Sequence, residues 1–126
     1  MSNYVYEQPI IIPNYSSNIT LTSGSSTKTW DGSALSNRII TQSNFSITDL
    51  NTNTKCSNIK FTANYSNFPS ITNEGTVSNT FSVSNKQYFI NNTENITQYI
   101  LPENEHVTIK NGTLKINANP TIGTTT

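Results

Sequence analysis

The chain is poor in the side chains that carry most protein chemistry. Its 126 residues include one cysteine, one histidine, one tryptophan, seven basic and seven acidic residues. A single cysteine, Cys56, excludes a disulfide within the chain. The balanced charge leaves no surplus of Lys and Arg, which excludes a protein that binds nucleic acid by neutralising its phosphates. No apolar run approaches the roughly 18 residues that a membrane-spanning helix needs.

Three short neutral polar residues dominate instead, with 20 Asn, 20 Thr and 16 Ser. Such a composition is common in disordered chains, so the placement of the apolar residues decides whether the chain folds. The strand formers Val, Ile, Thr, Tyr, Phe and Trp number 51, against 25 for the strong helix formers Ala, Leu, Glu, Lys, Gln, Arg and Met. Branched and aromatic side chains suit a pleated surface. The composition therefore predicts a single all-β domain.

The strongest local pattern is the stretch 106–117, HVTIKNGTLKIN. Asn111-Gly112 is a preferred pair for a two-residue type I′ turn, because both positions of that turn need a positive φ. The turn would pair Lys110 with Thr113, and the flanking apolar residues would then share one face. Those apolar residues are Val107, Ile109, Leu114 and Ile116. We therefore expect a β-hairpin here.

Other strands are expected where apolar and polar residues alternate. The clearest is 57–65, with Ile59, Phe61, Ala63 and Tyr65 on one face. A further strand carries Val77, Phe81 and Val83 on one face after a turn at 73–75. Shorter strands are expected at 18–22, 27–30, 38–42, 45–48, 87–90 and 98–101. Short strands separated by Gly, Asn and Ser predict an antiparallel β-sandwich or small barrel of the jelly-roll or immunoglobulin-like type.

The two ends of the chain differ from this body, which we place at 18–117. The N-terminal segment 1–17 contains an apolar stretch, 4–12, that is interrupted by Pro9 and followed by Pro13. Proline removes ladder donors, so the stretch suits an edge strand that closes the sandwich or an extended arm that docks on a neighbouring subunit. The residues that would dock are Tyr4, Val5, Tyr6, Ile10, Ile11 and Ile12. With no Lys or Arg before the prolines, we expect no secretory signal. Residues 118–126 have little to bury and are expected to form a tail.

Candidate catalytic groups are sparse. His106 is the sole histidine and stands at the start of the expected hairpin. Cys56 follows Lys55, which favours the thiolate, but no motif places a histidine beside it, so a half-buried thiol is the simpler interpretation. Glu103 and Glu105 are two residues apart on one strand, whereas acid and base pairs usually come from different elements. No G-x-S-x-G element is present. We expect no enzyme and no cofactor.

A metal site is not expected either. Asp49, Asn51 and Asn53 match the first three ligand positions of a calcium loop. The glycine of the sixth position is replaced by Thr54 and the glutamate of the twelfth by Lys60, so the match breaks where geometry and charge matter most. The stretch is better interpreted as a turn.

Carbohydrate recognition has one candidate site. Such sites combine an aromatic ring with short amide, hydroxyl and carboxylate groups. The stretch 29–33, TWDGS, supplies these around Trp30 and Asp31. Because a lone tryptophan in a β-sandwich is often part of the core, both interpretations of Trp30 stay open.

The neutral polar surface indicates an assembly. Only six Lys residues are present, so the outer strand faces are filled with Asn, Thr and Ser. Long neutral strand edges invite pairing, and they are typical of virion shells, fibres, adhesins and surface layers. The run 28–34, KTWDGSA, resembles a turn of small trimeric head-decoration proteins of phages. The chain thus resembles accessory virion proteins of the capsid-decoration or head- and tail-fibre type.

The resemblance implies a homotrimer in the virion, assembled in the host cytoplasm, whose N-terminal arm adds a strand to a capsid protein. We therefore expect a non-enzymatic structural protein of a virus or phage particle. The alternative is an extracellular glycan-binding or adhesin module that uses Trp30 and Asp31. A host-modulating effector is a third class, and no residue pattern favours it.

Overall fold

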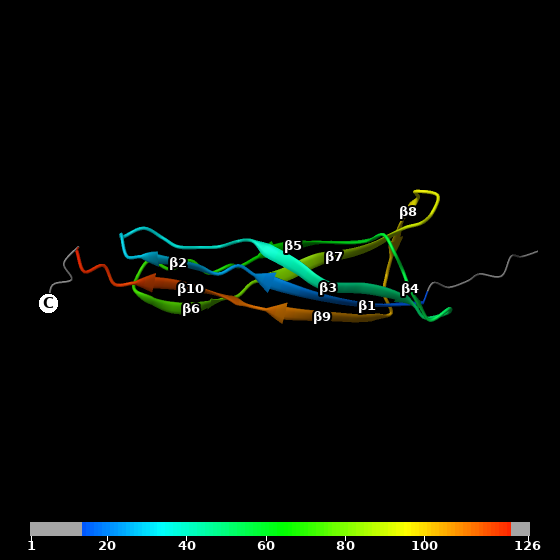
Figure 1. Ribbon diagram of the computed structural model, residues 1–126, viewed down its shortest axis with the longest axis horizontal. Coiled ribbons are helices and arrows are strands. Elements are labelled where there is room, and N and C mark those ends of the chain that lie inside the picture. The colour runs from blue at the N-terminus through cyan, green and yellow to red at the C-terminus, as the bar shows by residue number, and fades with distance from the viewer. Residues whose placement is uncertain (1–13, 122–126) are drawn as a thin grey trace, which may run out of the picture.

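A computed structural model describes residues 14–121, and these residues form an all-β molecule of elongated shape (Figure 1). The predicted all-β class is confirmed. The strands are β1 (Tyr15–Ser23), β2 (Ser26–Thr29), β3 (Ile40–Asp49), β4 (Thr54–Lys55), β5 (Ile59–Ser66), β6 (Gly75–Asn79), β7 (Ser82–Asn91), β8 (Thr97–Ile100), β9 (Asn104–Lys110) and β10 (Gly112–Asn117).

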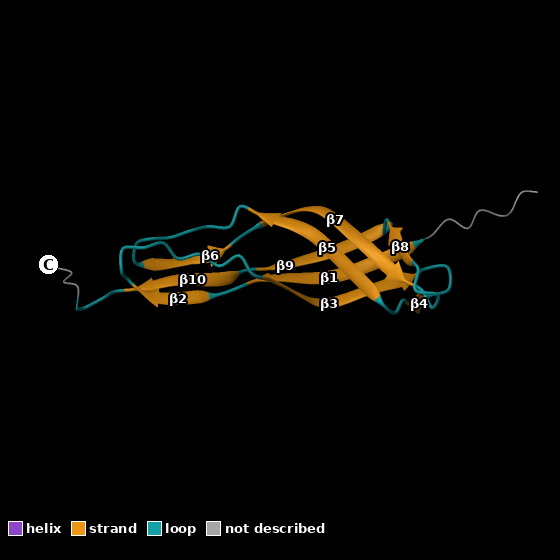
Figure 2. Cartoon of the chain, turned by 90° about the horizontal axis from the view of Figure 1, so that it is seen from above, coloured by secondary structure: helices purple, strands orange, loops and turns teal. Residues whose placement is uncertain are grey.

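The strands form three sheets, none of which closes into a barrel. A four-stranded sheet has the order β4-β3-β1-β9, and two three-stranded sheets, the β10 sheet and the β7 sheet, have the orders β2-β10-β6 and β5-β7-β8. Figure 2 shows β5 and β7 crossing over the four-stranded sheet, while the β10 sheet lies toward the opposite end. The small-barrel alternative is therefore wrong for the described residues.

The main core lies where the β7 sheet covers the four-stranded sheet. Its buried members are Ile19, Leu21, Ile47, Phe61, Tyr88 and Ile100. The alternation predicted for 57–65 is confirmed, because all four apolar residues of β5 belong to this core or pack against it. Phe61 meets Tyr88 edge to face with ring centroids 5.1 Å apart. The β10 sheet has its own buried residues, Leu114 and Ile116.

The predicted hairpin at Asn111-Gly112 is wrong. The strands β9 and β10 do not pair with each other: β9 pairs in parallel with β1, and β10 pairs in parallel with β2 and antiparallel with β6. The chain instead continues from β9 into β10 along the long axis of the molecule (Figure 1). Parallel pairing also departs from the purely antiparallel sheet that we expected.

Gly112 is required here by space and not by a turn. Within residues 14–121, the glycines with a positive φ are Gly32 and Gly75. Gly112 and Asn111 therefore both lack the positive φ that a type I′ turn needs. A Cβ on Gly112 would collide with the backbone carbonyl oxygens of Ser23 and Gly24. The segment β1–β2 runs parallel to the segment β9–β10, and the offset between paired residues is the same in both ladders. Ser16 pairs with Asn104 and Ser26 with Leu114, and each pair is 88 residues apart.

The break between the two ladders forms a waist, which we define by Ser23, Gly24, Asn37, Asn79 and Gly112. The hydroxyl of Ser23 accepts a hydrogen bond from the Gly112 amide at 2.9 Å and donates one to the carbonyl of Asn79 at 2.5 Å. The buried amide of Asn79 donates to the carbonyls of Gly24 (2.9 Å) and Asn37 (2.8 Å). At the waist, where the chain passes from the four-stranded sheet to the β10 sheet, side-chain hydrogen bonds thus take the place of the ladder hydrogen bonds.

Two bulges change the predicted strand boundaries. In β3, Asn44 has a φ of 50° where the register with β1 shifts, so the expected strands 38–42 and 45–48 are one strand. In β7, Asn85 has a φ of 52° at the shift against β5. The strand expected to carry Val77, Phe81 and Val83 is divided between β6 and β7, which belong to different sheets.

Candidate functional site

The six residues of the predicted docking segment, Tyr4, Val5, Tyr6, Ile10, Ile11 and Ile12, lie outside the described residues. The structure does place the point where this segment joins the body. The carbonyl of Asn14 accepts a hydrogen bond from the amide of Leu50, and that of Tyr15 accepts one from the amide of Glu103, each at 2.8 Å. Strand β1 begins at Tyr15, so the last three residues of the segment 1–17 belong to the body.

Exposed apolar residues occur in the segments at the end of the molecule where β1 begins, which also carries β4 and β8 (Figure 1 shows these strands). We call four of them the β8-end surface: Leu50 in the β3–β4 turn, Ile96 before β8, Tyr99 in β8 and Leu101 after β8. Their exposed fractions are 36%, 55%, 49% and 74%. Tyr99 also packs edge to face on Phe89 of β7, with centroids 5.8 Å apart.

The β8-end surface is not evident from the sequence. The sequence predicts a strand at 98–101. Tyr99, Ile100 and Leu101 are three apolar residues in a row, so the alternation does not show which of them faces the core. Only the register shows that Ile100 faces Tyr88 in the core, whereas Tyr99 pairs with Phe89 on the outer face. The run of apolar residues was the available signal.

The candidate glycan site, Trp30 and Asp31, lies after β2 at the other end of the molecule. Oδ1 of Asp31 contacts Nζ of Lys28 (2.6 Å) and accepts from the amide (3.0 Å) and hydroxyl (2.7 Å) of Ser33. The Lys28 hydrogen bond, followed by those from Ser33, lowers the pKa of Asp31 well below its usual value. This carboxylate oxygen is therefore engaged inside its own turn.

Trp30 is half-buried. Its amide donates to the carbonyl of Asn117 (2.8 Å), and its carbonyl accepts from Nδ2 of Asn119 (3.0 Å), which ties residues beyond β10 to the turn. A Cβ on Gly32 would lie 3.8 Å from the indole ring. These bonds hold the backbone of Trp30, and the residue as a whole is half-buried.

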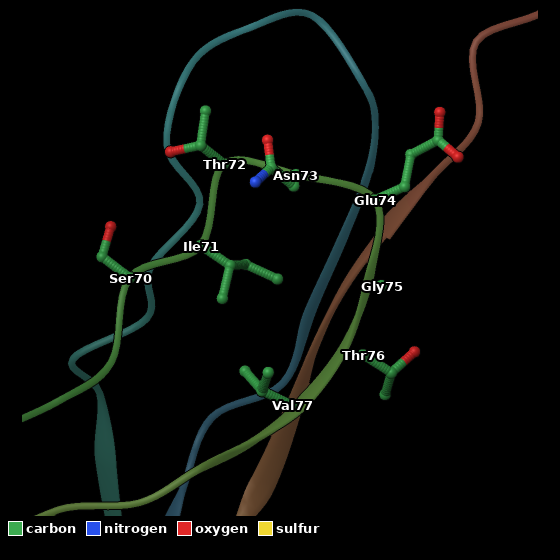
Figure 3. A pocket seen from close by; sticks show the side chains of 8 residues that line it. All are labelled: Ser70, Ile71, Thr72, Asn73, Glu74, Gly75, Thr76 and Val77. Carbon is green, nitrogen blue, oxygen red and sulfur yellow. The ribbon is translucent and has the colours of Figure 1, made fainter.

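A hollow of about 520 Å³ lies on the segment 70–77 before and within β6 (Figure 3). Figure 3 shows Ile71 and Val77 pointing into the bend, whereas the carboxylate of Glu74 points away from it. The remaining lining residues are Ser70, Thr72, Asn73, Gly75 and Thr76. With one carboxylate and no histidine, cysteine or lysine in its lining, this hollow holds no catalytic pair.

The structure separates the candidate catalytic residues. His106 is exposed in β9 opposite Asn18. Cys56 is half-buried, as expected, and its amide donates to the carbonyl of Ile47 at 2.8 Å. Burial, followed by the charge of Asp49, raises the pKa of the Cys56 thiol, which disfavours the reactive thiolate.

Glu105 takes part in a link between sheets. It forms an ion pair with Lys86 of β7, and both Glu105 and Glu103 are exposed residues. Burial raises the pKa of the nearby Tyr88 to about 12; the hydroxyl of Ser17 opposes this rise and the charge of Glu105 adds to it. These contacts between β1, β7 and β9 join the two layers of the core.

In residues 14–121, no group of three or more His, Cys, Asp or Glu side chains is placed to hold a metal ion. The calcium-like stretch forms the β3–β4 turn, in which the Asn51 amide donates to the Asp49 carboxylate at 2.9 Å and Asn53 has a φ of 55°. The described part also contains no helix long and apolar enough to cross a membrane.

Comparisons with known protein families, with curated proteins and with solved structures found no match for this chain.

Proposed function

We propose that the protein is a non-enzymatic structural component of a virus or phage particle, of the capsid-decoration or fibre type. In this proposal the β7 sheet and the four-stranded sheet act as a β-sandwich, and the segment Tyr4–Ile12 docks on a capsid or other virion protein. The chains associate with each other, with a homotrimer as the favoured form. The observation that carries the proposal is the β8-end surface beside the point where the apolar segment joins the body.

The distribution of apolar side chains supports self-association. Eight hydrophobic residues are buried in the described part, and seven large hydrophobic residues are exposed there. Four of the seven belong to the β8-end surface, and exposed apolar residues that form one patch commonly mark an interaction site. A net charge of zero also provides no repulsion between copies.

The proposal is tested on particles and on the purified chain. Particles produced with the full chain should contain it in a fixed ratio to the capsid protein when analysed by mass spectrometry. Deleting residues 1–13 should remove the chain from the particles. A full chain that sediments as a monomer, together with unchanged incorporation after the deletion, would refute the proposal.

The alternative, a glycan-binding or adhesin module, is supported by the partial exposure of Trp30. An aromatic ring accessible at the surface is the element that stacks on a sugar in such sites. Titration with a panel of oligosaccharides should then change the Trp30 emission, and Trp30→Phe should abolish binding in a separate calorimetric assay. If no saccharide changes the emission, this alternative is excluded for that panel.

A further inference from the structure

We infer that the segment Tyr4–Ile12 of one copy docks on the β8-end surface of a second copy and adds a strand to the free edge of β8. The inference names the self-association partner within the proposed function and depends on it. The occupant is a second copy of this chain, and the acceptor is built from Leu50, Ile96, Tyr99 and Leu101.

The place where the segment joins the body brings it to this surface. Asn14 is held by the amide of Leu50, and Tyr15 by the amide of Glu103, two residues after Leu101. One member of the β8-end surface, Leu50, thus lies beside the start of β1, and Leu101 precedes the second bonded residue, Glu103, by two positions. Thirteen residues precede Asn14. At about 3.3 Å per residue, the nine residues of Tyr4–Ile12 span roughly 30 Å when extended, which is ample for the four residues of β8.

Proline favours docking on a neighbour over folding back. Strand β1 follows the long axis and begins at the end of the molecule (Figure 1). The ring of Pro13 fixes its own φ, and Ile12 is restricted to extended conformations because it precedes proline. In this proposal the extended segment therefore reaches a second copy and does not fold back on its own body.

The spacing of the two prolines suits strand addition. Pro9 and Pro13 are four residues apart, so their nitrogens lie on the same side of an extended strand. When the edge with the two proline nitrogens faces away from β8, the amides of Gln8, Ile10 and Ile12 lie on the other edge and face β8. The even-numbered side chains also share one face, and four of the five are apolar: Tyr4, Tyr6, Ile10 and Ile12.

The acceptor offers both backbone and side chains. Among the described strands, β8 pairs only with β7, so its other edge is free to accept a strand. Tyr99 and Leu101 lie on and beside this edge with exposed fractions of 49% and 74%. Because the segment leaves from the same end that receives it, exchange between copies is compatible with a closed oligomer such as the favoured homotrimer.

The first experiment compares three forms of the full chain by sedimentation velocity. Leu101→Asp places a charge in the acceptor and should raise the dissociation constant of the oligomer at least about tenfold. The matched control is Ile39→Asp, because Ile39 is similarly exposed (67%) but precedes β3 near the waist. It should leave the oligomer unchanged. Ile10→Asp should dissociate the oligomer as Leu101→Asp does.

The second experiment tests exchange between copies. A chain without residues 1–13 keeps the acceptor, and the Leu101→Asp chain keeps the segment. Each alone should be monomeric, and a mixture should form a complex that contains both chains, as native mass spectrometry would detect. Circular dichroism and thermal melting of each form verify that it is folded.

The outcomes separate this inference from the proposed function. If Leu101→Asp and Ile10→Asp both leave a folded oligomer intact, docking on the β8-end surface is refuted. If the two defective chains remain monomeric in the mixture, the segment does not dock on a second copy. In either case, loss of the chain lacking residues 1–13 from particles would still support docking on another virion protein, and so the proposed function.

Discussion

Six asparagines in the described residues adopt a φ between 50° and 62°. They are Asn44, Asn53, Asn58, Asn67, Asn85 and Asn95. Asparagine tolerates this left-handed conformation better than most residues, because its short side chain bonds to the nearby backbone. The high asparagine content therefore has a structural use, since these residues form the bulges of β3 and β7 and several turns.

Asn79 has a different role, as a buried donor at the waist. Asn79→Ala would leave the partly buried carbonyls of Gly24 and Asn37 without their donor, at a cost of about 2–4 kcal/mol. We expect the urea midpoint to fall accordingly. Asn64→Ala, on the exposed face of β5, is the control and should change the free energy of unfolding by less than about 0.5 kcal/mol. Equal effects of the two substitutions would contradict this role.

Tyr88 should make the stability depend on pH in the alkaline range. Its pKa is raised from 10.0 to about 12 in the folded protein, chiefly by burial. The unfolded state loses this proton at a lower pH than the folded state. The contribution of the Tyr88 hydroxyl to the free energy of unfolding is therefore complete below pH 10 and is lost as the pH rises toward 12. The full loss amounts to roughly 3 kcal/mol, since the shift is about two pKa units and each unit corresponds to about 1.4 kcal/mol.

The measurement is the free energy of unfolding in urea between pH 9 and pH 12, compared between the wild type and Tyr88→Phe. The stability of the wild type relative to Tyr88→Phe should fall as the pH rises, because only the wild type has the hydroxyl that ionises. Tyr99→Phe removes a hydroxyl from the exposed outer face and serves as the control. A constant difference between wild type and Tyr88→Phe would show that the Tyr88 hydroxyl has no part in the alkaline loss.

At the scale of elements, the path from β9 to β10 explains why the hairpin prediction failed. The sequence Asn-Gly between alternating residues is compatible with a type I′ turn and also with a straight crossing that needs a residue without Cβ. The alternation is the same in both cases, since β10 buries Leu114 and Ile116 against its own sheet. Local chemistry cannot separate the two, because the difference lies in which strands are neighbours.

Substitutions at these two positions distinguish the crossing from the turn. Gly112→Ala should cost about 1–3 kcal/mol or more, because the carbonyls of Ser23 and Gly24 are backbone atoms that cannot yield easily. Asn111→Ala should cost less than about 0.5 kcal/mol, because Asn111 is exposed and has no positive φ. Urea denaturation of both variants decides the matter. A large cost for Asn111→Ala would instead favour the turn.

At the scale of the whole molecule, association should depend on apolar contact more than on charge. The chain has no net charge, and the described residues contain two ion pairs, Lys28–Asp31 and Lys86–Glu105, both within one copy. Raising NaCl from roughly 0.05 M to roughly 0.5 M shortens the Debye length about threefold. We expect the sedimentation coefficient of the oligomer to stay the same across this range. Dissociation at high salt would indicate an electrostatic interface.

The sequence by itself determined the all-β class, the strand 59–66 within one residue or two, and the turns at 50–53 and 73–74, because these depend on side-chain type, period and local backbone preference. It also identified Tyr4–Ile12 as an apolar segment and Cys56 as a half-buried thiol. Only the tertiary structure decided that β9 and β10 pair with other strands, that two bulges join predicted strands, and that Tyr99 and Leu101 are exposed. The pairing of β1 with β9 and of β2 with β10 joins residues 88 positions apart, and no local pattern specifies which distant strand supplies the partner.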